Sequence, residues 1–117
     1  MKYVIIVYIV IAIVLTGCYK DNEETLYGEV TCDTTSVSFS NDILPIIEMN
    51  CTVTGCHVAG GSAPGIYENY NQIKAKVDDG KFKDRVLVQQ DMPPGTPLTE
   101  CQILYITKWL NDGAPNN

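Results

Sequence analysis

The sequence predicts a small all-α fold of three to four short helices joined by long loops. No window shows the apolar–polar alternation with a period of two that a half-buried strand requires. Several segments combine apolar residues at helical spacing with helix start or stop signals. Stretches rich in glycine and proline separate these segments, which favours connecting loops.

The first helix is expected over residues 43–49. Residues 40–42 (Ser-Asn-Asp) precede it and offer side-chain oxygens that can cap a helix N-terminus. Pro45 falls within the first turn, where its missing N–H would have had no partner inside the helix. The glycine-rich stretch from Asn50 to Pro64 is expected to be mostly loop after a short turn.

Two further helices are expected in the middle of the chain. Residues 67–77 have helical character, and the sequence 78–80 (Asp-Asp-Gly) ends that helix. Residues 81–89 are expected to form another short helix. Residues 91–97 contain three prolines and one glycine, so they cannot form regular structure.

The final helix is expected to begin after the cap at residues 99–100 (Thr-Glu) and to run to about Asn111, with Gly113 as its stop signal. The apolar stripe of this helix consists of Ile103, Ile106, Trp109 and Leu110. A domain of about 80 residues with helices this short has a thin core. It therefore needs additional stabilisation from cross-links or a buried group.

The N-terminus has the pattern of a targeting segment. Lys2 is followed by an unbroken apolar run of 13 residues, 3–15, which is shorter than the roughly 20 residues that span a bilayer. Residues 15–18 (Leu-Thr-Gly-Cys) resemble the lipobox of bacterial lipoproteins, in which cleavage leaves an acylated cysteine. We therefore expect a signal peptide over 1–17 and a lipid on Cys18. The alternative is a plain signal anchor with an incidental cysteine.

The predicted mature chain has an acidic flexible tether over 18–37 and a folded domain over 38–117. Loss of the signal peptide leaves seven Lys and Arg against fourteen Asp and Glu, a formal charge of −7. This charge argues against a nucleic-acid partner, because phosphates would be repelled, and it suits a protein partner with a basic patch. Residues 20–24 resemble the acidic export signal of some surface lipoproteins; the alternative is a solvated linker.

The cysteines point to a covalently bound cofactor. Five are present, and an exported chain sits in an oxidising compartment, where thiols do not stay idle. With Cys18 assigned to lipid, the other four form either two disulfides, or one disulfide and one pair that carries haem. Cys51, Cys56 and His57 read C-T-V-T-G-C-H, which offers two thiols for the haem vinyl groups and an imidazole for the iron. A Cys51–Cys56 disulfide and a zinc site are the alternatives.

The spacing of this motif departs from the common C-x-x-C-H. Two extra residues place the cysteines five sequence positions apart, and at that spacing their thiols do not share a face of a regular α-helix. Residues 52–55 must therefore bulge. Gly55 gives the backbone the conformational freedom that such a bulge requires.

From Ser38 onward the chain resembles a class I, mono-haem cytochrome c domain of a Bacteroidetes-type bacterial lipoprotein. The motifs that carry the resemblance are residues 39–47 (FSNDILPII), Cys51-x4-Cys56-His57, residues 92–95 (MPPG) and residues 109–115 (WLNDGAP). They occur in the order of the family. The resemblance implies a small helical fold around covalently attached haem c and a function in electron transfer.

The resemblance also implies the axial ligands of the iron. His57 would bind the proximal face, and Met92 would bind the distal face from the proline-rich loop. The alternative for Met92 is an ordinary packing methionine. His57 is the only histidine, so no second histidine can compete, and Met49 lies only two residues before Cys51. In the family, a proline carbonyl accepts the ring N–H of the proximal histidine. The resemblance assigns this role to Pro64. The alternative is that Pro64 is an ordinary turn proline.

In class I cytochromes the first and last helices cross, which would bring Cys32 close to Cys101. A disulfide between them would close a loop of about 70 residues.

The sequence thus predicts a lipid-anchored electron carrier of the cell envelope, facing the periplasm or the surface of the outer membrane. With both axial positions filled, no open position remains for a substrate, so the chain is not expected to be an enzyme. Two alternatives stay open. One is a cofactor-free, disulfide-stapled surface lipoprotein that binds a partner; the other is a haem enzyme or sensor whose sixth site is open.

Overall fold

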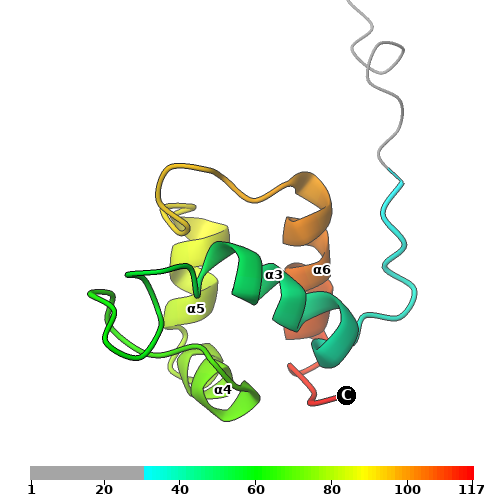
Figure 1. Ribbon diagram of the computed structural model, residues 1–117. Coiled ribbons are helices and arrows are strands. Elements are labelled where there is room, and N and C mark those ends of the chain that lie inside the picture. Colours follow the sequence, from blue (N-terminus) through cyan, green and yellow to red (C-terminus); the bar gives the residue numbers. More distant parts are fainter. Residues whose placement is uncertain (1–30) are drawn as a thin grey trace, which may run out of the picture. The chain divides into compact units, whose positions relative to one another are not determined.

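The computed structural model describes residues 31–117 (Figure 1). The predictions for the signal peptide, for Cys18 and for most of the tether lie outside the described residues. The regular structure within 31–117 is helical and contains no strand, which confirms the all-α prediction for this part of the chain. The elements are η1 (Phe39–Ile43), α3 (Leu44–Asn50), α4 (Tyr70–Asp78), α5 (Lys81–Lys83), η2 (Asp84–Val88) and α6 (Glu100–Asn111).

The first helical segment begins earlier than predicted. Ser38 is the N-cap: its Oγ accepts a hydrogen bond from the backbone N of Asn41 at 3.1 Å, and its own backbone N donates to Asp42 Oδ2 at 2.8 Å. The prediction of a cap at residues 40–42 was therefore wrong, because an additional π-helical turn, η1, precedes α3. This turn places Phe39 in the core, where its side chain is 5 % exposed. Pro45 lies in the first turn of α3, as predicted.

The middle helices follow the prediction with one shifted boundary. α4 starts at Tyr70 instead of residue 67, because Asn69 Oδ1 caps it by accepting from the backbone N of Gln72 at 3.1 Å. Gly80 has a φ of +78°, which separates α4 from α5 at the predicted stop. Together α5 and η2 cover the segment that was predicted as one short helix.

The last helix, α6, has the predicted start and a complete capping box. Thr99 Oγ1 accepts from the backbone N of Gln102 at 3.3 Å, and Gln102 Oε1 accepts from the backbone N of Thr99 at 2.9 Å. Ile106 and Trp109 of the predicted stripe are buried. Ile103 and Leu110 are half-buried at its margins.

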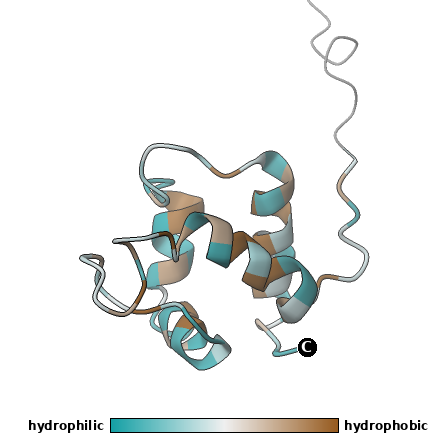
Figure 2. Ribbon diagram, viewed as in Figure 1, coloured by the Kyte–Doolittle hydropathy of each residue, from teal (hydrophilic) through white to brown (hydrophobic). Residues whose placement is uncertain are grey.

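The core draws buried apolar residues from every helical element, and η1 contacts both α3 and α6. Figure 2 shows apolar residues gathered where α3 crosses α6. The rings of Phe39 and Trp109 lie 5.8 Å apart between centroids. Trp109 is fully buried, and its Nε1 donates to the carbonyl O of Pro115 at 2.9 Å. Asn117 Oδ1 accepts from the backbone N of Phe39 at 2.8 Å, which ties the C-terminal end of the chain to η1. The first and last helical segments are thus packed together.

A disulfide joins Cys32 to Cys101 across 69 residues of sequence, with the Cα atoms 5.4 Å apart. This is the pair that the sequence analysis expected. Val37, between Cys32 and η1, is buried in the core. The folded unit therefore starts before Ser38, where the domain boundary was predicted, because both the cross-link and Val37 attach the preceding residues to it.

Removing this disulfide is expected to destabilise the domain. The double substitution Cys32→Ser and Cys101→Ser should lower the free energy of unfolding by about 4 kcal/mol, because the unfolded chain regains the entropy of an open loop of this length. Denaturant titration followed by tryptophan fluorescence measures the change through Trp109. A difference below about 1 kcal/mol would contradict the entropic argument.

Candidate haem-binding site

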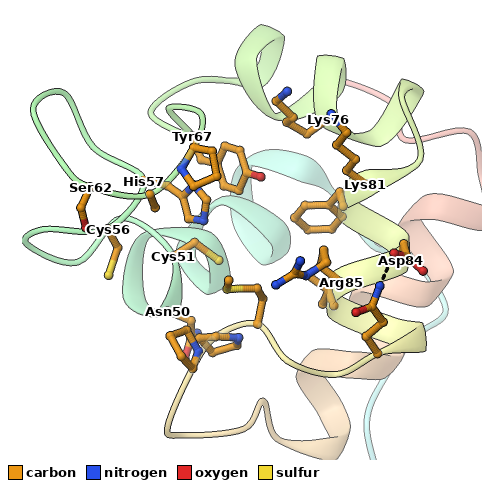
Figure 3. A pocket seen from close by; sticks show the side chains of 18 of the residues that line it. Asn50, Cys51, Cys56, His57, Ser62, Tyr67, Lys76, Lys81, Asp84 and Arg85 are labelled. Carbon is orange, nitrogen blue, oxygen red and sulfur yellow. Dashed lines mark hydrogen bonds between the residues drawn. The ribbon is translucent and has the colours of Figure 1, made fainter.

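A cavity of about 500 Å³ lies between the loop that follows α3 and the segment from α5 to Met92 (Figure 3). Its volume falls within the range of roughly 300–1,000 Å³ that is usual for small-molecule and cofactor sites. The five residues that the sequence analysis assigned to cofactor binding all line this one cavity: Cys51, Cys56, His57, Pro64 and Met92. Residues 41 positions apart in the chain are thereby brought together.

His57 is held in a fixed orientation at the wall of the cavity. Its side chain is 9 % exposed, and its Nδ1 lies 3.0 Å from the carbonyl O of Gly65. A carbonyl oxygen can only accept, so Nδ1 is the nitrogen that donates to Gly65, and Nε2 is the ring nitrogen left to act as a ligand. The ring stacks on Tyr67, with centroids 4.1 Å apart and planes only 2° from parallel. This arrangement fixes the ring and leaves Nε2 as the nitrogen without a backbone partner.

The carbonyl that orients His57 belongs to Gly65, so the prediction for Pro64 was wrong by one residue. Gly65 has a φ of +94°, a conformation open to glycine that turns the chain after Pro64 and leaves the Gly65 carbonyl facing the ring. Pro64 remains in the cavity wall as an apolar contact surface.

The two extra residues of the cysteine motif form a closed bulge, as predicted. Cys51 is the C-cap residue of α3, and its carbonyl O accepts from the backbone N of His57 at 3.1 Å, so the chain returns to its starting point. Gly55 has a φ of +86° within the bulge. Gly61 packs so tightly against the loop that a Cβ there would overlap the carbonyl O of Cys56. Backbone contacts therefore position both thiols and the imidazole together.

Cys51 and Cys56 are free thiols in the structure and are not joined to each other. Burial, with a smaller contribution from the neighbouring Cys56, raises the pKa of the Cys51 thiol to about 11, so this thiol is neutral at pH 7. A zinc ion would have to deprotonate this buried thiol, whereas a thioether carries no charge. Among residues 31–117, no three His, Cys, Asp or Glu side chains gather with the spacing of a metal site.

The opposite wall of the cavity combines apolar and cationic side chains that the sequence analysis did not assign. Phe82 and Val86 are 2 % and 7 % exposed and line the cavity. Their i, i+4 spacing on the predicted helix over 81–89 is the signal that could have identified them. Figure 3 shows Lys81 and Arg85 across the cavity from the cysteine side. No sequence signal distinguishes these two from solvated surface cations.

Tyr67 is a further cavity residue that was not predicted from the sequence. Its backbone N donates to the carbonyl O of His57 at 2.9 Å, in addition to the ring stacking. Burial, and to a smaller extent the neighbouring Cys51 and Asp79, raises the pKa of its phenol, so the ring that supports His57 stays neutral.

The chain matches no protein-family model, and neither a curated protein nor a solved structure is significantly similar to it. The functional argument therefore depends on the residues themselves. Across the described residues, no helix is both long enough and apolar enough to cross a bilayer.

Proposed function

We propose that the chain is a lipid-anchored, mono-haem c-type cytochrome that transfers electrons, with His57 and Met92 as axial ligands. One observation carries the proposal. Two thiols, an imidazole with an available nitrogen, and a thioether line a single cavity of cofactor size. These are the groups that covalent attachment and His/Met ligation of haem require.

The donor set of the cavity fits haem c. Cys51 and Cys56 would form thioethers with the vinyl groups, and the protonation of Nδ1 leaves Nε2 of His57 for the iron. Lys81 and Arg85 in the cavity wall would supply positive charge for the carboxylates of the haem. The apolar surface of Phe82 and Val86 would pack on the ring.

Bound haem would supply a one-electron Fe(III)/Fe(II) couple. The chain's own residues would tune that couple. Buried apolar groups lower the local dielectric, and a thioether ligand such as Met92 favours Fe(II) and raises the potential. With His57 and Met92 both engaged, no position would be left for a substrate, which favours an electron carrier over an enzyme.

An absorbance spectrum of protein made with a haem-attachment system tests this proposal. A low-spin spectrum with a Soret band is expected for the electron carrier. Absence of a Soret band would instead favour a cofactor-free partner-binding lipoprotein. A high-spin spectrum would favour a haem enzyme or sensor with an open sixth position.

The membrane anchor and the partner are part of the same proposal. Lipid on Cys18 would hold the domain at the cell envelope, and the mature charge of −7 suits a redox partner that presents a basic patch. Binding to such a partner should weaken as ionic strength rises.

Substituting Cys18→Ser should release the protein from the membrane fraction, because the lipid-modified Cys18 would be its only covalent attachment to lipid. Fractionation of cells followed by immunoblotting measures the distribution. Cys32→Ser with Cys101→Ser provides a matched control, since it removes cysteines without touching the lipobox. If the Cys18 variant remained membrane-bound like the wild type, the anchor assignment would be wrong.

A further inference from the structure

The loop that carries Met92 is tied to η2 through Arg85 and Asp91. Arg85 Nε donates to Asp91 Oδ1 at 2.7 Å, and Arg85 Nη2 lies 2.7 Å from Asp91 Oδ2. The backbone N of Asp91 also donates to the carbonyl O of Arg85 at 3.2 Å. Two parallel contacts between a guanidinium and a carboxylate fix orientation as well as distance, and the backbone contact adds a third constraint.

The chain reverses sharply between these two residues. Gln90, which directly precedes Asp91, has a φ of +53°, a left-handed conformation that a residue with a side chain adopts only when its surroundings hold it. The Arg85–Asp91 contacts join the two ends of this reversal. Because Asp91 is bonded directly to Met92, they also determine where the Met92 side chain begins.

Met92 is not packed against protein on every side. A second cavity, of about 40 Å³, also borders Met92 and is lined in part by Val86, Leu98 and Ile103. Met92 therefore borders both the main cavity and this smaller space. A thioether is a neutral, weak ligand, so its time on the iron depends on how firmly the loop is held.

We propose that the Arg85–Asp91 ion pair is a positioning device that keeps the Met92 sulfur on the haem iron. This inference rests on the proposed function. Arg85 and Asp91 would act through the backbone of the loop and would not touch the iron. Loss of the pair should raise the fraction of molecules whose sixth position is open, while the covalent attachment of haem at Cys51 and Cys56 stays intact.

The test uses Asp91→Asn, because Asp91 does not line the main cavity, whereas Arg85 does. The oxidised, haem-loaded full-length protein is titrated with imidazole, which must displace Met92 to bind. The apparent dissociation constant for imidazole should fall about fivefold in this variant. The constant scales inversely with the fraction of molecules whose sixth position is open, and a half-exposed ion pair can change that fraction by about this factor. Asp78→Asn is the matched control: it removes a carboxylate from the exposed Lys74–Asp78 pair of α4, away from the cavity, and should leave the constant unchanged.

Two further measurements distinguish a positioning role from a merely structural one. They are the dependence of the imidazole dissociation constant on ionic strength and the value of that constant in a conservative variant. Salt screens a half-exposed ion pair, so at high salt the imidazole dissociation constant of the wild type should approach that of Asp91→Asn. The dissociation constant of the variant should change little with salt. Asp91→Glu keeps a carboxylate for Arg85 and should restore at least half of the change in binding free energy. Haem content and thermal unfolding of Asp91→Asn establish that the fold is retained.

The outcomes separate the two proposals. A fivefold change that salt abolishes and Asp91→Glu reverses supports the positioning role. If Asp91→Asn keeps methionine ligation and binds imidazole with the same dissociation constant as the wild type, the positioning role is overturned. The proposed function is then unaffected. Wild-type protein without covalent haem, or without sulfur ligation, overturns both.

Discussion

Met92→Ala is expected to convert a low-spin haem spectrum to a high-spin or ligand-exchanging one. The weak near-infrared band that marks sulfur ligation of Fe(III) should disappear. His57 is the only histidine of the chain, so no imidazole can take the vacant position. Met49 is 72 % exposed and lies in α3, two residues before Cys51, outside the cavity lining.

The same substitution should lower the reduction potential by about 0.2 V, a fraction of the roughly 0.8 V range that axial ligands span, because a thioether stabilises Fe(II). Potentiometric titration followed by absorbance measures this shift. Met49→Ala is the matched control, and it should change neither spectrum nor potential. If Met92→Ala behaved like this control, another group would have to bind the iron, and the electron-carrier assignment would lose its main support.

Substituting Cys51 and Cys56 together with serine should abolish covalent attachment of haem. Two thioethers keep the group on the polypeptide through denaturing gel electrophoresis, whereas a haem held only by axial ligands leaves when the protein unfolds. Haem staining at the mass of the protein should therefore be lost completely in the double variant. Each single variant should retain one thioether and stain less strongly, because one fewer bond forms during maturation.

Cys32→Ser with Cys101→Ser is the matched control for this experiment, since it removes the same number of thiols away from the cavity. It should keep full haem staining despite its lower stability. The host must be able to mature a motif with four residues between the cysteines. In such a host, wild-type protein without haem staining would contradict the proposed cofactor.

Much of the helical framework could be predicted from local sequence signals. The start of α6 follows from Thr99 and its neighbours, and the stop after α4 follows from Gly80, because capping and chain reversal depend on a few adjacent residues. Local signals failed where packing decided the boundary. Ser40 was an acceptable cap, yet the helix begins earlier, because an extra turn buries Phe39 against Trp109.

The candidate site was predicted as a set of residues but not as a geometry. The thiols, the imidazole and the thioether were identified from their types and order in the chain. That the Gly65 carbonyl orients His57 depends on a backbone conformation after Pro64 that no local pattern specifies. Arg85 is similar: in sequence it resembles any surface arginine, and only the folded chain brings its guanidinium to Asp91.

The sequence by itself determined the all-α class, the order of the helices and the residue types that could bind haem, because these depend on short-range periodicity and on chemistry that each side chain carries alone. Only the tertiary structure decided that His57 and Met92 line the same cavity, that the bulge after Cys51 closes on itself, and that the pair Arg85–Asp91 holds the Met92 loop. These features join residues from different elements. They arise when burial of the apolar faces of α3 and α6 fixes where the intervening loops run.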